Sequence, residues 1–224
     1  MMTRTKLCDR VLPDYTKGEE LFNTLSHTAG AVFGIVALIT CLFAAVTDGS
    51  PWSVTSAAIY GTSLILLYTM SSLYHGLKHE MVKKVFQVID HCTIYLLIAG
   101  TYTPVMLCSI RLVSPGWAWT IMGIVWGCAV LAAILTAIDL KRFAVFSMIC
   151  YLGMGWCVVL AIKPTMEALP LNALLWILYG GISYTVGAIL YGFGKKHRYM
   201  HSIFHLFVLA GSVLQYIGII FYVL

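Results

Sequence analysis

Charged residues are scarce in this 224-residue chain: 10% of its residues are charged and 60% are hydrophobic. A soluble domain carries about a quarter charged residues, so this composition excludes one. The apolar runs also lack the alternation of polar and apolar residues that is typical of a membrane β-barrel. They continue for about twenty residues, as in "AAIYGTSLILLYTMSSLY" (57–74), which indicates membrane-spanning helices.

Two further patterns are missing. The first twenty residues are polar and mixed in charge, without the apolar segment and small-residue cleavage site of a secretory leader, so we expect no cleavable signal peptide. The seven cysteines are odd in number and form no CxxC pair. We therefore interpret them as small packing residues rather than as a disulfide framework.

We predict an all-α membrane protein, a seven-helix transmembrane bundle. Residues 1–20 are expected to form a cytoplasmic N-terminal segment and residues 21–224 the transmembrane domain. The breaks between the apolar runs are short, so helices that are neighbours in sequence should be neighbours in space. The predicted spans are residues 21–46, 53–76, 85–109, 116–138, 143–162, 171–193 and 200–224.

Lysine and arginine are distributed unevenly over the predicted loops. When alternate loops are placed together, twelve of these residues fall on one side and two, Arg111 and Lys163, on the other. Because positive residues mark cytoplasmic loops, we predict a multi-pass protein of the cell (inner) membrane with its N-terminus inside and its C-terminus outside. The net charge of +5 then reflects topology and attraction to anionic lipid, and we expect no nucleic-acid partner. The twelve residues are Arg4, Lys6, Arg10, Lys17, Lys78, Lys83, Lys84, Lys141, Arg142, Lys195, Lys196 and Arg198.

All seven histidines fall on the predicted inner half of the chain, and three of them stand out. His201 and His205 are four residues apart and project from one face of the last span, and His75 ends the second span. Three imidazoles suit a tetrahedral Zn²⁺ with an open fourth position, as in catalytic zinc sites. The alternatives are ordinary polar contacts at the membrane interface and haem binding, although haem is better served by one histidine from each of two helices.

Two polar side chains are expected beside these histidines. Asp90 lies six residues beyond Lys84, roughly 9 Å along a helix, and a charge at this depth is costly unless it is paired. A carboxylate there can orient or deprotonate a water bound to the metal. Ser71 lies one turn before His75 and can supply a hydrogen bond. The alternatives are an interfacial anchor or an ion-pair partner for Lys84 in the case of Asp90, and a back-bond to its own helix in the case of Ser71.

The segments that carry these residues resemble those of the hemolysin-III-like membrane proteins. This group belongs to the progestin and adipoQ receptor family and is related more distantly to the alkaline ceramidases. The resemblance covers nearly the whole chain. It implies a seven-helix fold with the N-terminus inside and a zinc ion held by His75, His201 and His205, with Asp90 on the metal water and Ser71 in support. The matching segments are "EELFNTLSH" (19–27), "SSLYH" (71–75), "DHCTIYLLIAGTYTP" (90–104) and "HSIFHLFVLAGS" (201–212).

The first of these segments contributes three more candidate residues. Glu20, Asn23 and His27 have the spacing i, i+3, i+7 and therefore share one helix face. They can reach the metal site and hold its ligands in place by hydrogen bonds, or they can line an entrance on the inner side. A polar face at the membrane interface explains the same spacing equally well.

The leading functional hypothesis is a zinc-dependent hydrolase that cleaves an amide or ester bond in a lipid-like substrate. The resemblance supports it, because related proteins are linked to lipid amide hydrolysis, notably of ceramides. Membrane lipids are then the expected partners. One alternative is a non-enzymatic receptor or membrane-homeostasis regulator with a structural, four-ligand zinc. Another is a pore-forming or lytic protein, although the fourth to sixth spans show almost no polar residues.

Overall fold

The computed structural model describes residues 5–193 and 197–224 of the chain. Within these residues, seven helical segments are long and apolar enough to cross a membrane, and no β-strand occurs. The all-α, seven-span prediction is therefore confirmed. The segments are α1 (Lys17–Asp48), α2 (Pro51–Gly76), α3 (Glu80–Pro104) continued by the π-helix Val105–Ile110 and α4 (Arg111–Val113), α5 (Pro115–Ile138), α6 (Ala144–Gly155) continued by the 3-10 helix Cys157–Ala161 and α7 (Ile162–Ala168), α8 (Leu171–Phe193), and α9 (Met200–Tyr222).

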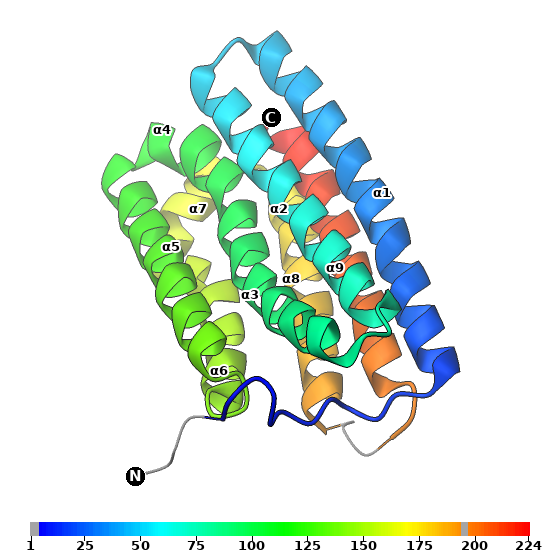
Figure 1. The fold of residues 1–224 in the computed structure, drawn as a ribbon. Helices are drawn as coiled ribbons and strands as arrows, with labels where there is room; N and C mark the ends of the chain where they lie inside the picture. The colour runs from blue at the N-terminus through cyan, green and yellow to red at the C-terminus, as the bar shows by residue number, and fades with distance from the viewer. Residues whose placement is uncertain (1–4, 194–196) are drawn as a thin grey trace.

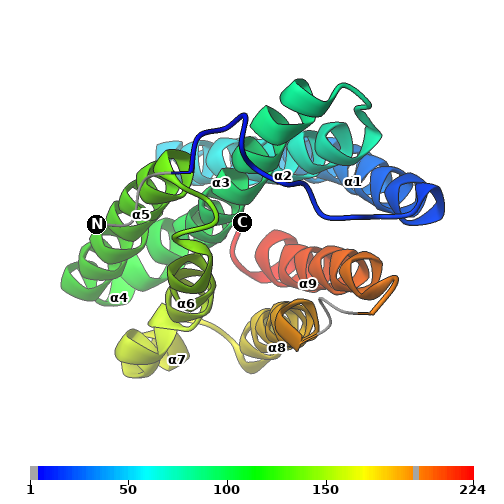
Figure 2. The ribbon, with the colours of Figure 1, turned by 60° about the horizontal axis from the view of Figure 1, so that its bottom comes forward.

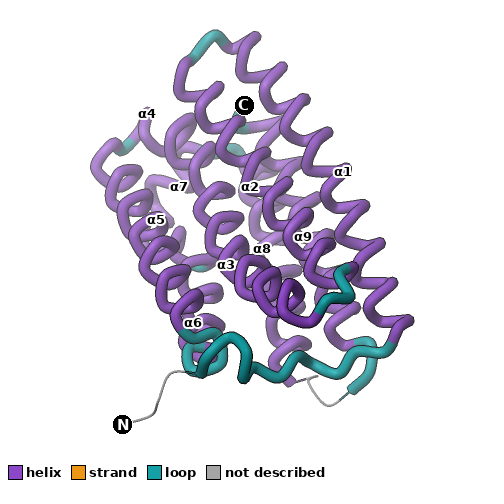
Figure 3. Tube along the Cα trace, viewed as in Figure 1, coloured by secondary structure: helices purple, strands orange, loops and turns teal. Residues whose placement is uncertain are grey.

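The seven segments form a closed ring in the order of the sequence (Figures 1 and 2). Each packs on the next, and α9 completes the ring against α1. The α1–α2 and α8–α9 pairs are in contact along their length, whereas α6 barely touches α8. Figure 3 shows that the connections are short turns at the two ends of the bundle. The wall between α6 and α8 is therefore the loosest part of the ring.

The outer surface of the ring is apolar. Large hydrophobic side chains such as Ile39, Phe43, Val145 and Leu160 are exposed on it. In water such a surface would promote aggregation, whereas the hydrocarbon core of a membrane solvates it well. This arrangement agrees with a multi-pass membrane protein.

Several helix boundaries differ from the predicted ones. Helix α1 begins at Lys17 rather than residue 21, because Thr16 and Glu19 form a capping box in which each side chain bonds the other's backbone N–H. The predicted loop 163–170 is mostly helical, since Pro164 lies in the first turn of α7, where its missing N–H has no cost. Pro104 ends α3, and the wider π-helix follows it directly.

The first described residues and the C-terminus lie at opposite ends of the bundle, as an odd number of crossings requires (Figure 1). The side of the membrane that each end faces stays a prediction from the charge distribution. Three residues of that distribution, Arg4, Lys195 and Lys196, lie outside the described residues. All seven cysteines are free, in agreement with the expected lack of a disulfide framework, but Cys8 and Cys128 are exposed and are not packing residues.

Candidate metal centre

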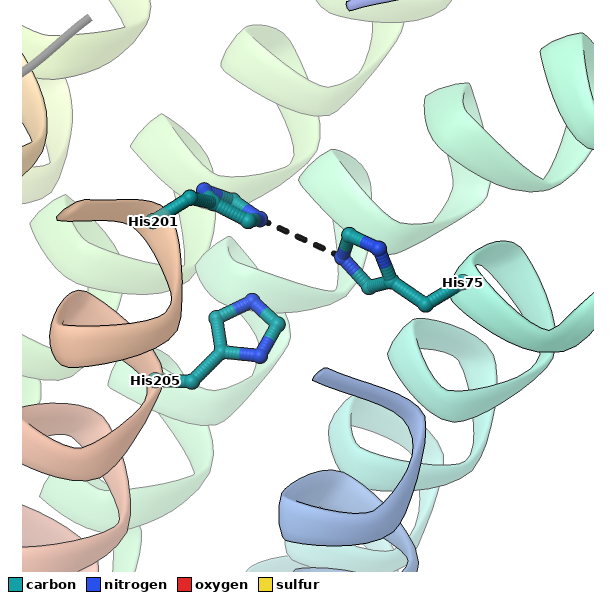
Figure 4. A group of neighbouring side chains, drawn as sticks. All are labelled: His75, His201 and His205. Atoms are coloured by element: carbon teal, nitrogen blue, oxygen red, sulfur yellow. Dashed lines mark hydrogen bonds between the residues drawn. The ribbon is translucent and has the colours of Figure 1, made fainter. Parts of the chain in front are cut away.

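Three histidines converge near the N-terminal end of the bundle. His75 comes from the last turn of α2, and His201 and His205 come from the first turns of α9. One ring nitrogen from each lies within 4.8 Å of the other two. Figure 4 shows the three rings turned toward a common space, with Nε2 of His201 and Nε2 of His75 3.2 Å apart. This group can hold a metal ion.

The spacing of one pair of donors fits a divalent metal with tetrahedral preference, within a group of three whose nitrogens all lie within 4.8 Å of one another. Two nitrogens that bind one Zn²⁺ at about 2.0–2.1 Å must lie roughly 3.3 Å apart, which is close to the observed 3.2 Å separation of the Nε2 atoms of His75 and His201. Nε2 of the buried His75 faces a second imidazole nitrogen, and such a pair needs either a shared proton or a shared cation. Nitrogen ligands in a closely spaced group of three are typical of zinc sites that keep one position open.

Glu20 fixes the orientation of the first histidine. Its carboxylate Oε2 lies 2.7 Å from Nδ1 of His75, and its Oε1 lies 2.7 Å from Nζ of Lys83. A carboxylate only accepts hydrogen bonds, so Nδ1 of His75 carries the proton and Nε2 carries the lone pair that faces the site. Lys83 also donates to the backbone carbonyl of His75 at 3.1 Å. This is the carboxylate–histidine arrangement found behind many metal ligands.

The same face of α1 brings Asn23 and His27 to the histidine group. The Asn23 side chain is fully buried, with Nδ2 3.5 Å from Nδ1 of His75. The His27 ring stacks on the ring of His205, with centroids 3.7 Å apart and planes 21° apart, and meets the ring of Tyr68 edge-on. Gly30, one turn further along α1, makes room for Tyr68, because a Cβ there would collide with the tyrosine ring. The three α1 residues singled out in the sequence thus face the metal candidate rather than the lipid.

Asp90 and Ser71 line the same cavity as His201 and His205. Asp90 is buried on α3, and the Ser71 side chain on α2 interacts with its carboxyl group. The cavity has a volume of about 150 Å³ and is lined mainly by apolar side chains of α3, α6, α8 and α9. Within the described part of the chain, the close ligand group contains the three histidines and not Asp90. The geometry therefore places Asp90 near the site but outside the set of nitrogen donors.

The other histidines stay outside the group. His91 turns back to its own helix, with Nδ1 2.8 Å from the carbonyl of Gln87 and 3.9 Å from the Asp90 carboxylate. His79 precedes α3 as its N-cap residue, and His197 is exposed in the turn before α9.

The segment before α1 covers the site at the N-terminal end of the bundle, which the sequence did not reveal. The Tyr15 ring stacks on His201 at 5.1 Å and 20° and lies 5.7 Å from the His75 ring. The segment is anchored further back, where the backbone N–H of Thr5 donates to Asp139 and Nζ of Lys84 donates to the carbonyl of Cys8. Burial raises the pKa of the Tyr15 hydroxyl, so this group is neutral at physiological pH.

Comparison with known proteins gives one consistent family. Residues 15–216 match the family described as Haemolysin-III related. The chain is 41% identical to Hemolysin-3 of Bacillus cereus over 92% of both chains. It is 37% identical to the Hemolysin-3 homolog of Bacillus subtilis (strain 168), over 93% of this chain and 96% of that protein. A weaker similarity, 25% identity over 75% of this chain and 70% of the relative, links it to the human monocyte to macrophage differentiation factor.

Proposed function

The chain belongs to the Haemolysin-III related family of membrane proteins, and from that premise we propose that it is a zinc-dependent hydrolase of an amide or ester bond in a lipid-like substrate. The observation that carries the proposal is the close group of His75, His201 and His205, of which His201 and His205 line a cavity that Asp90 also lines. Three neutral nitrogens leave a zinc ion one open position, and the nearby carboxylate provides a proton acceptor.

Each residue of the site has a specific task in this proposal. The three histidines hold the metal, and Glu20 keeps His75 in the tautomer that offers Nε2. When bound, zinc polarises a carbonyl group and lowers the pKa of a coordinated water. Asp90 takes a proton from the attacking water onto its carboxylate and returns it to the leaving nitrogen or oxygen. Ser71 orients the Asp90 carboxyl group during this exchange.

The cavity supports a lipid-like substrate. Its walls are mainly apolar, and it extends from the histidines along α9 as far as Gln215, ten residues beyond His205 and roughly 15 Å further into the bundle. An apolar chain can occupy this space while its polar head stays at the metal. The sparse contact between α6 and α8 is the natural place for such a molecule to enter from the membrane.

The names of the bacterial relatives suggest lysis as an alternative activity. A water-filled pore requires polar side chains along several whole helices. The cavity inside the bundle is instead lined mainly by apolar side chains such as Ile98, Leu152 and Val208. The hydrolase proposal accounts for the buried polar cluster, whereas a pore does not.

The test uses protein purified in detergent without chelators. Elemental analysis is expected to find about one zinc per chain, and a His201→Ala/His205→Ala double variant is expected to lose it. The same preparations are then assayed against a panel of lipid amides and esters, before and after removal and restoration of zinc. Zinc that stays bound without any turnover across the panel would favour the receptor or regulator with a structural zinc, and the absence of zinc would contradict both.

A further inference from the structure

His27 is a buried polar group beside the metal candidate to which the proposed chemistry gives no task. Its side chain is 3% exposed, and neither of its ring nitrogens has a hydrogen-bond partner among the described residues. A neutral imidazole carries one N–H donor and one acceptor, and burying both unpaired is destabilising. His27 also lines the cavity that contains His201, His205 and Asp90. The missing partner is therefore expected to be a molecule in the cavity.

The stacked geometry argues against His27 as a further metal ligand. A ring nitrogen binds a metal along the plane of its own ring. The ring of His27 lies over the ring of His205, with centroids 3.7 Å apart and planes only 21° apart. Because an ion in the plane of one ring lies well outside the plane of the other, the two histidines cannot both point a lone pair at it. His27 faces the space beside the metal position instead.

We propose that His27 is a substrate-positioning residue that donates a hydrogen bond to a carbonyl or carboxylate oxygen in the head of an amphiphile bound in the cavity. This inference rests on the proposed function for the identity of the ligand. It adds a hydrogen-bonding contact from α1, a helix that packs on α2 next to Asp90's helix α3. Stacking on His205 and the edge contact with Tyr68 hold the imidazole in place for this contact.

The experiment measures binding rather than turnover, so hydrolysis can fail while the inference stands. The full chain is loaded with cobalt in place of zinc, and decanoate is titrated while the visible spectrum of the metal is recorded. His27→Phe is compared with the wild type, with His27→Gln, which can still donate a hydrogen bond, and with Tyr68→Phe as the control. Tyr68 packs in the same place, but its hydroxyl bonds Ser212 at 2.6 Å rather than the cavity ligand.

We expect His27→Phe to keep one metal per chain and to bind decanoate about tenfold more weakly or worse, the scale of a hydrogen bond to a charged group. His27→Gln should recover part of the affinity, and Tyr68→Phe should match the wild type. Should phenylalanine not fit, the smaller His27→Leu carries the same expectation. Loss of metal from the His27 variants would make His27 a ligand. Unchanged decanoate affinity in His27→Phe would make His27 a packing residue, and so would a wild-type protein that does not bind decanoate. Any of these three results overturns the inference.

Discussion

Glu20 and His75 come from different helices and meet through a single hydrogen bond of 2.7 Å between Oε2 and Nδ1. Lys83 binds the other oxygen of the same carboxylate at the same distance. The contact decides which nitrogen of His75 is free, and it joins the ends of α1, α2 and α3 around the candidate metal site. Orientation of a metal ligand and packing of three helix ends therefore depend on one side chain.

The first prediction concerns this contact. Glu20→Gln keeps the size of the side chain but removes its charge, so His75 loses its strongest acceptor and its preference for one tautomer. Zinc affinity is expected to fall by about 10- to 100-fold, the usual effect of removing such a partner. Competition with a chelator of known affinity measures it.

Glu80→Gln is the matched control. Glu80 forms an ion pair of the same length with Lys84, but its side chain is 74% exposed. The zinc affinity of the Glu80→Gln variant should equal that of the wild type. An equal loss in both variants would show that Glu20 acts through general charge and not through His75.

The second prediction concerns Tyr15, whose ring covers His201. Tyr15→Ala removes the cover and the stacking contact, so a chelator should remove zinc from the folded protein about two- to tenfold faster, in line with the strength of an aromatic pair. The amount of zinc bound at equilibrium should change little. Val11→Ala, at a 91% exposed position of the same segment, is the control. Equal rates in all three proteins would contradict a covering role.

The fold was largely predictable because each membrane span is encoded locally. A run of about twenty apolar residues specifies a helix without knowledge of its neighbours. The errors arose at the ends, where specific contacts decide. The start of α1 could have been predicted from the Thr16-x-x-Glu19 pattern, which is typical of a capping box. The helical segment 162–168 could not have been predicted, since its polar residues resemble those of a loop.

The histidine group was predictable for a related reason. Helical periodicity puts His201 and His205 on one face, and the order of the spans brings His75 to the same end of the bundle. The contacts of Tyr15 and Lys83 could not be predicted in this way. Tyr15 lies in a segment without periodicity, and its position depends on the path of the chain across the ends of several helices. The ion pair of Lys83 with Glu20 depends on how tightly α1 approaches the turn after α2.

The third prediction is the orientation of the bundle. Among the described residues, the lysines and arginines gather at the end where the described chain begins, and the opposite end carries Arg111 and Lys163. Positive loops are retained in the cytoplasm, so the C-terminus should be outside. A reporter enzyme that works only outside the cytoplasm is expected to be active when fused after Leu224 and inactive when fused after Lys141. The reverse pattern would invert the topology.

The fourth prediction is that Asp90→Asn keeps the metal and loses the activity. Asparagine has nearly the same shape and can still interact with Ser71, but it cannot accept a proton at neutral pH. Because Asp90 lies outside the close group of nitrogen donors in the described structure, zinc content should stay at about the wild-type level. Hydrolysis should fall by about 10²-fold or more, the usual scale for removal of a general base.

Zinc content and lipid cleavage must be measured on the same purified Asp90→Asn protein, because the two readouts separate three roles for this carboxylate. Loss of zinc before loss of activity would make Asp90 a ligand. Full activity with full zinc content would mean that Asp90 is only an interfacial anchor, and it would exclude the proposed proton transfer. Retained zinc with little turnover is the result expected if Asp90 handles the proton while His75, His201 and His205 hold the metal. Ser71→Ala should then show the same pattern in weaker form, since it removes only the group that orients the carboxylate.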